Sequence, residues 1–218
     1  MKQRGVTKRQ KELLLLIYNS YRDNGYPPNF DEFKEKLNIS SNQAIIDHLA
    51  SLERKGLILR EEKSARSIKI KPLGYEILEV NPLVPIVGTS YAGAFAESIQ
   101  IDGNWQEVSR DVQQLQEEVF LIKISGDSMI NAGIIDGDQL LVKNQPEFVT
   151  GDIVLAQTSE GTTVKRFISQ DSPPYLYLKP ENPKYQNILF TPDVEMKGKI
   201  IGKYESGFIK PLVQGRIL

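Results

Sequence analysis

The spacing of apolar residues changes near Pro85, and this change constrains the fold more than any other feature of the chain. Before Pro85, the apolar residues up to about position 55 recur every three or four positions, as they do along one face of a helix. After it, short apolar runs alternate with glycine, aspartate, asparagine and proline, a pattern typical of strands joined by turns. The sequence therefore predicts an α+β chain in which a helical module precedes a mostly-β barrel or sandwich.

The two predicted modules also differ in charge. We expect the first at residues 1–71, a linker at 72–84 and the second at 85–218. Residues 1–72 hold 15 Lys and Arg and 9 Asp and Glu, so their net charge is +6, whereas the remainder carries −7. A basic module is suited to a polyanion such as nucleic acid. Chance clustering of surface charge is the alternative.

Three capping boxes punctuate the basic module. In each, a polar cap residue is followed three positions later by Gln or Glu, so that the two side chains can satisfy backbone amides of the first helical turn. The pairs are Thr7 with Gln10, Asn29 with Glu32, and Ser40 with Gln43. They predict helices over residues 8–24, 30–37 and 41–55, the last ending at Gly56 in a left-handed cap.

A β-hairpin is predicted after the third helix, because two apolar runs at 57–60 and 67–70 flank a charged turn. Three helices followed by a hairpin are the element order of a winged helix-turn-helix, whose second helix of the pair enters the major groove of DNA. The expected contacts are Ser41, Asn42, Gln43, Ile46 and Asp47 with bases, and Lys63 and Arg66 of the wing with phosphates. A plain three-helix bundle and a protein-binding winged helix remain alternatives.

The second module contains a candidate nucleophile, Ser128, and a candidate base, Lys165. A serine hydroxyl needs an adjacent base, and the single histidine, His48, falls in the predicted DNA-binding helix. A Ser-Lys pair is a known substitute for the triad. Lys165 stands among apolar and β-branched residues, where desolvation would lower its pKa. With the small pair Ala92-Gly93 upstream, the chain has the parts of a protein that cuts itself.

Each of these candidates has an ordinary interpretation as well. Serine in a Gly-Asp-Ser turn is commonly a cap or turn residue, a strand lysine commonly faces solvent, and small pairs such as Ala92-Gly93 are common in loops. The residues taken one at a time therefore leave the chemistry open.

Composition excludes several other classes of protein. Without cysteine the chain has no disulfide, thiolate zinc site or cysteine nucleophile. Neither a metal nor another cofactor is expected. No apolar run approaches the roughly 18 residues of a membrane span, and the charged N-terminal segment differs from a secretory signal. We expect a cytoplasmic protein with no membrane partner.

The whole set of motifs resembles the LexA family of self-cleaving repressors of the bacterial DNA-damage response. The matching segments, in the order and spacing of the family, are Gly25-Tyr26-Pro27-Pro28, His48-Leu49, Leu52 to Ile58, Ala92-Gly93, Ser125-Gly126-Asp127-Ser128-Met129, Asp136-Gly137-Asp138 and Val164-Lys165-Arg166. Any one segment is weakly specific, whereas all of them on one chain are highly specific.

The resemblance implies a winged-helix repressor fused to a β-rich Ser-Lys self-peptidase that also forms the homodimer. It implies that Ser128 is the nucleophile, Lys165 the general base and Ala92-Gly93 the bond cut. In that family a RecA filament on single-stranded DNA promotes the cut, which would part the DNA-binding module from the dimerising one and so remove avidity for operator DNA. Residues 40–47 differ from family versions, so the operator sequence cannot be inherited.

Three alternatives to this function stay open at this point. One is a phage- or plasmid-type repressor with the same self-cleavage. Another is a DNA-binding dimer whose peptidase is vestigial. The last is a peptidase that acts in trans, as the related signal peptidases do.

Overall fold

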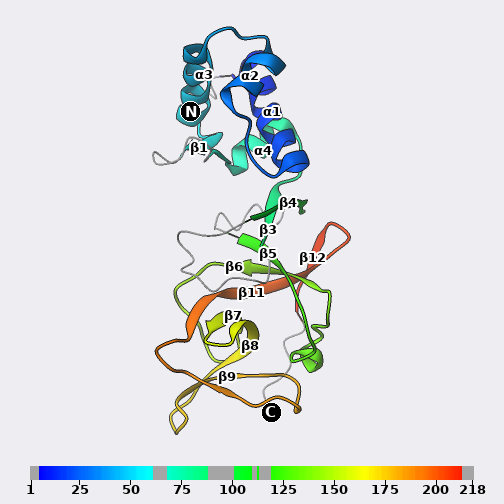
Figure 1. Cartoon of the computed structure of the whole chain (residues 1–218), viewed down its shortest axis with the longest axis vertical. Helices are drawn as coiled ribbons and strands as arrows, with labels where there is room; N and C mark the ends of the chain where they lie inside the picture. The colour runs from blue at the N-terminus through cyan, green and yellow to red at the C-terminus, as the bar shows by residue number, and fades with distance from the viewer. Residues whose placement is uncertain (1–4, 61–67, 88–100, 110–111, 113–118, 213–218) are drawn as a thin grey trace. The chain divides into compact units, whose positions relative to one another are not determined.

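The computed structural model describes residues 5–60, 68–87, 101–109, 112 and 119–212 (Figure 1). They form two compact units. The first contains the described residues up to Leu83 together with those between Gly103 and Gln116, and the second contains the rest. The α+β class is confirmed, since helices dominate the first unit and strands the second. None of the helices in the described part of the chain combines the length and apolar character needed to cross a bilayer.

The first unit begins with two helices that have the predicted bounds, α1 (Lys8–Asn24) and α2 (Phe30–Leu37). Both predicted capping boxes are present: Thr7 pairs reciprocally with Gln10, and Asn29 with Glu32. The helix ends are also conventional, because α1 stops at Gly25, whose φ of 84° is left-handed and favours glycine.

The third helix, α3 (Asn42–Arg54), corrects one prediction. Its N-cap is Ser41, one residue later than expected, and no side-chain capping bond is made there. Gln43 therefore occupies the second helical position instead of the third and cannot reach back to the cap. Its side chain instead donates to Asp47 Oδ1 at 2.9 Å, one turn ahead. The capping box at Ser40 is wrong, although the helix it predicted exists.

The predicted hairpin follows as β1 (Ile58–Arg60) paired antiparallel with β2 (Ile68–Ile70). Its turn, with Lys63 and Arg66, lies outside the described residues. Apolar side chains from the three helices and the hairpin share one core, whose fully buried members include Leu13, Leu14, Ile17, Ile45, Leu52 and Leu57.

The stretch expected as a linker contains a further helix, α4 (Pro72–Leu78). Pro72 stands at its first position, where the missing N–H has no intrahelical partner to lose. Tyr75 and Leu78 of this helix are buried in the core of the first unit. Residues 72–78 are thus part of a packed unit because they bury apolar side chains, which a solvated linker would not do. Where the domain boundaries lie otherwise remains a prediction.

The second unit is built on a coiled sheet. Its strands are β3 (Leu83–Val87), β5 (Val119–Lys123), β6 (Gln139–Lys143), β7 (Ile153–Thr158), β8 (Gly161–Ser169), β9 (Leu176–Lys179), β10 (Ile188–Leu189), β11 (Glu195–Glu205) and β12 (Phe208–Lys210). Neighbours follow the order β10-β9-β8-β7-β11-β6-β5-β3, with β12 beside β11. The remaining strand, β4 (Ile101–Glu107), begins the segment that continues into the first unit.

Strand β11 pairs with β7 along its first part and with β6 along its second part, and each pairing contains one irregularity in register. Gly198 lies at one of them, and a Cβ there would come within 2.7 Å of the Lys143 carbonyl oxygen, so a larger residue would push the strands apart. Both faces of β7 are buried. Ile153 and Leu155 enter one apolar cluster, while Val154 and Ala156 enter another.

Candidate active site

Two parallel strands place the start of the Ser128 loop next to Val87, the last described residue before the expected cleavage segment. β3 pairs parallel with β5, Ile86 opposite Leu121 and Val87 opposite Ile122. The chain leaves both strands in the same direction and at nearly the same level. The turn with Ser128 follows β5, and the segment 88–100, which contains Ala92-Gly93 and lies outside the described residues, follows β3.

Ser128 lies between β5 and a single 3-10 turn, η1 (Ile130–Ala132), on a loop held from several sides. Gly126 has a φ of 100°, a conformation that a side chain would disfavour. Its N–H donates to Asp136 Oδ1 at 2.8 Å. After Ser128, the Asn131 N–H donates to the Glu181 carbonyl at 2.9 Å. The backbone is therefore held on either side of Ser128.

Asp127 anchors the same loop to a distant turn. Asn182 Nδ2 donates both to its backbone oxygen, at 3.0 Å, and to its carboxylate, at 3.1 Å. The Tyr185 hydroxyl donates to the other carboxylate oxygen and holds the pKa of Asp127 below its usual value. Sequence reasoning missed Asn182 and Tyr185. The proline-flanked run 180–183 indicated only a turn, with nothing to show what the turn contacts.

Lys165 reaches Ser128 from strand β8. Its Nζ lies 2.9 Å from Ser128 Oγ, 2.6 Å from Thr163 Oγ1 and 3.0 Å from the Val164 carbonyl oxygen. Only 6% of the residue is exposed. Burial removes water from the ammonium and lowers the pKa of Lys165 from 10.5 to about 8.

The three contacts of Lys165 suit both protonation states of its amine. The ammonium has three donors and no lone pair, and all three donors have an acceptor here. On losing a proton, the amine keeps two donors, for the Val164 carbonyl and Thr163. Its lone pair then faces Ser128 and can accept the hydroxyl proton. The arrangement can therefore activate a serine for acyl transfer.

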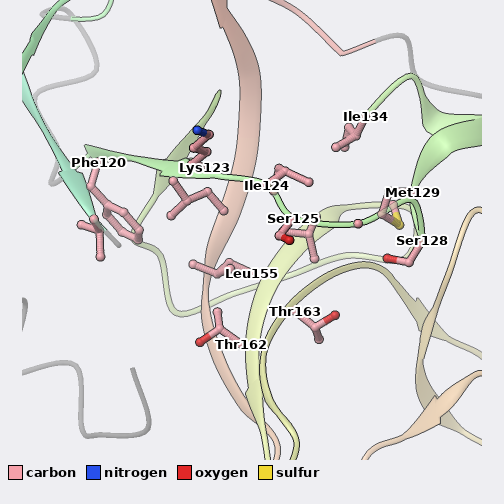
Figure 2. A pocket seen from close by; sticks show the side chains of 14 residues that line it. Phe120, Lys123, Ile124, Ser125, Ser128, Met129, Ile134, Leu155, Thr162 and Thr163 are labelled. Atoms are coloured by element: carbon pink, nitrogen blue, oxygen red, sulfur yellow. The ribbon is translucent and has the colours of Figure 1, made fainter. Parts of the chain in front are cut away.

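Ser128 also lines a hollow of about 290 Å³, shown in Figure 2. One wall is the strand and loop from Phe120 to Met129, and the facing wall carries Thr162 and Thr163 of β8. Val87, the last described residue before the expected cleavage segment, lines the same hollow. A second, more polar hollow of about 610 Å³ continues past Ser128 toward Tyr185 and Asp193. A polypeptide crossing Ser128 would have space on both sides.

Comparison with known proteins decides the family. Residues 85–203 match the Peptidase S24-like family and residues 3–67 the LexA DNA binding domain. The LexA repressor of Enterococcus faecalis is 36% identical, with 91% of this chain and 94% of the relative covered. Those of Ligilactobacillus salivarius and Listeria monocytogenes serotype 4a are 37% and 35% identical, covering 90% and 91% of this chain and 96% and 97% of the relatives. The chain belongs to the LexA repressor family.

The two family matches contain the residues that the sequence predicted for cleavage and for DNA binding. The peptidase match contains Ser128, Lys165 and Ala92-Gly93, and the DNA-binding match contains α1 to α3. The predicted base contacts at the start of α3 are all exposed, namely the N-cap Ser41 and the helix residues Asn42, Gln43, Ile46 and Asp47. His48 is half-buried on the same helix. In the described ranges no group of three or more His, Asp or Glu side chains could hold a metal ion.

Proposed function

We propose that this protein represses transcription by binding operator DNA as a homodimer, and that it inactivates itself by cutting Ala92-Gly93 with Ser128 and Lys165. The observation that supports this most directly is the 2.9 Å separation between Lys165 Nζ and Ser128 Oγ in a buried site. Such a repressor acts in the cytoplasm, where its operator is.

The chemistry follows from that contact. Neutral Lys165 takes the hydroxyl proton as Ser128 Oγ attacks the carbonyl carbon of Ala92, and a tetrahedral oxyanion forms. The Lys165 ammonium then gives its proton to the amide nitrogen of Gly93 as the C–N bond breaks. This leaves an ester between Ser128 and Ala92 and a free amine on Gly93. Water, deprotonated by Lys165, hydrolyses the ester.

Cleavage within one chain is favoured by the parallel pairing of β3 and β5. Ala92 is five residues beyond Val87, so an extended chain spans about 17 Å between them. Because Val87 and Ser128 line one hollow, the bond can be presented without a second molecule. Control then lies in how often the segment occupies the site. A RecA filament on single-stranded DNA would raise the rate by favouring the occupied state, without adding a catalytic group.

The proposal is tested by mass spectrometry of the purified chain after incubation at about pH 10. Two fragments that meet between Ala92 and Gly93 are expected. Only intact chain, both alone and with a RecA filament on single-stranded DNA, would contradict self-cleavage.

We expect the unassisted rate to rise with pH, because neutral Lys165 is the active base. With a pKa of about 8, about one tenth of the amine is neutral at pH 7 and nearly all at pH 10, so the rate should increase about tenfold and level off above about pH 9. Quantified gel bands at each pH measure this. A rate independent of pH between 7 and 10 would contradict a titrating lysine base.

Base and phosphate contacts should respond differently to mutation. Gln43→Ala should cost about 1–3 kcal/mol on an operator selected from random DNA by the wild-type chain, with little change on unrelated DNA. Arg66→Ala should weaken binding to every DNA about equally, and the slope of log affinity against log salt concentration should fall in magnitude by about one. Fluorescence anisotropy over a salt series separates the two. Lys179→Ala, an equal charge change on an exposed strand of the second unit, is the control for Arg66; loss on one sequence alone would show that Arg66 reads bases.

A further inference from the structure

Two packed elements flank the Ala92-Gly93 bond along the chain. The element before the bond packs in the second unit, and the element after it packs in the first unit. β3 precedes the bond, yet residues 84–87 belong to the second unit. The described residues of 103–112 follow the bond, yet they belong to the first unit. A cut at this bond would therefore leave each fragment with one element that packs in the unit formed mainly by the other fragment. We call this arrangement crossed packing.

β3 is firmly built into the second unit. Ile86 and Val87 pair with β5, and Val84 and Val87 are 3% and 7% exposed. Val87 shares an apolar cluster with Phe120 and Ile122. Removing β3 would expose these side chains to water and leave one side of β5 without the backbone partner that β3 provides.

The described residues of 103–112, here named the Trp105 segment, are held to the first unit by an aromatic contact and two side-chain hydrogen bonds. The Trp105 indole N–H donates to the Gly25 carbonyl at 2.9 Å, and its ring lies 4.7 Å from that of Tyr21, centroid to centroid. The Tyr18 hydroxyl donates to Glu107 Oε1 at 3.2 Å.

Val108 adds a further contact between this segment and the first unit. It is 1% exposed, and its N–H donates to the Pro82 carbonyl at 3.0 Å. Gly25, Tyr21, Tyr18 and Pro82 all precede the bond. The segment would thus leave its partners on the other fragment if the chain were cut.

We propose that cutting Ala92-Gly93 nicks the protein without separating it. Fragments 1–92 and 93–218 stay associated through β3 in the second unit and through the Trp105 segment in the first. Loss of operator binding then requires a second step, in which β3 dissociates from the second unit and the Trp105 segment from the first. The proposal takes the position of the cut from the proposed function, but its test does not depend on self-cleavage.

The test uses the full chain with Ser128→Ala and the recognition sequence of a site-specific protease inserted between Ala92 and Gly93. After complete cutting, shown on a denaturing gel, the two fragments should co-elute in size-exclusion chromatography at the mass of the uncut chain. Because Trp105 is the single tryptophan, its fluorescence should also stay unchanged. Separate elution at micromolar concentration would overturn the proposal.

A matched pair of variants tests the contacts of Trp105. In the nicked chain, Trp105→Ala should raise the dissociation constant between the fragments at least tenfold, while Phe208→Ala, at an exposed aromatic residue of β12, should leave it unchanged. Equal retention in both variants would overturn the role of Trp105. Uncut Trp105→Ala, compared by circular dichroism, shows whether the unit still folds.

The outcomes distinguish this proposal from the proposed function. A wild-type chain that cuts itself and falls apart overturns only the retention of fragments. A wild-type chain that never cuts, while the protease-nicked chain stays together, contradicts self-cleavage and supports the crossed packing.

Discussion

Ser128→Ala is expected to abolish self-cleavage at every pH and with any activator, because Ser128 Oγ is the hydroxyl that both contacts Lys165 Nζ and lies on the loop after β5, among the residues that the structure describes. Thr163 Oγ1 is also within 2.6 Å of Lys165 Nζ, but it belongs to strand β8 on the facing wall of the hollow. Intact-mass spectrometry after incubation at about pH 10, beside wild type, measures the effect.

The same variant should bind operator DNA as wild type does, since Ser128 lies in the second unit and the predicted base contacts lie on α3. Ser169→Ala, which removes the same hydroxyl from an exposed serine at the end of β8, is the matched control and should cleave as wild type does. Fragments from the Ser128→Ala chain would show that the nucleophile is a different residue.

Lys165→Met should reduce the cleavage rate by about 10²–10⁴-fold, the usual contribution of a general base. Methionine keeps much of the apolar stem that packs in the buried strand and removes the amine. The remaining slow reaction should also lose its dependence on Lys165 titration, so the rise between pH 7 and 10 should disappear. Gel quantification over the same pH series measures both effects.

Two further variants sharpen this test. Lys165→Arg keeps a cation that cannot lose its proton in this range and should be as inactive as Lys165→Met. Lys179→Met makes the same change on the exposed face of the neighbouring strand β9 and should cleave normally. An active Lys165→Arg chain would mean that the side chain only positions Ser128.

Nicking without separation changes what the cut would do to repression. If the crossed elements keep the fragments together, avidity for two half-sites survives the chemical step and is lost only as β3 or the Trp105 segment dissociates from its unit. The rate at which these two elements dissociate from their units would then determine how fast the operator is released. Cleavage and derepression can therefore be measured as two separate rates.

Local features of this protein were predictable from the sequence. Capping by Thr7 and Asn29, the breaks at Gly25 and Gly56, and the strand-like runs around Lys165 depend on neighbours a few positions away. The first three helices and most strands were predicted for that reason, whereas α4 was expected to be linker. The failed box at Ser40 shows the limit of such patterns, because a start one residue later changes which side chain can reach the cap.

The tertiary structure alone decided which distant residues meet. Ser128 and Lys165 are 37 positions apart, Asp127 and Tyr185 58, and Gly25 and Trp105 80. The resemblance to a family implied the first of these pairs, while no local pattern indicated the other two. Such contacts depend on sheet register and on which core accepts a passing segment, and both are set by burial and backbone pairing summed over the whole unit. Periodicity along the chain carries no record of that sum.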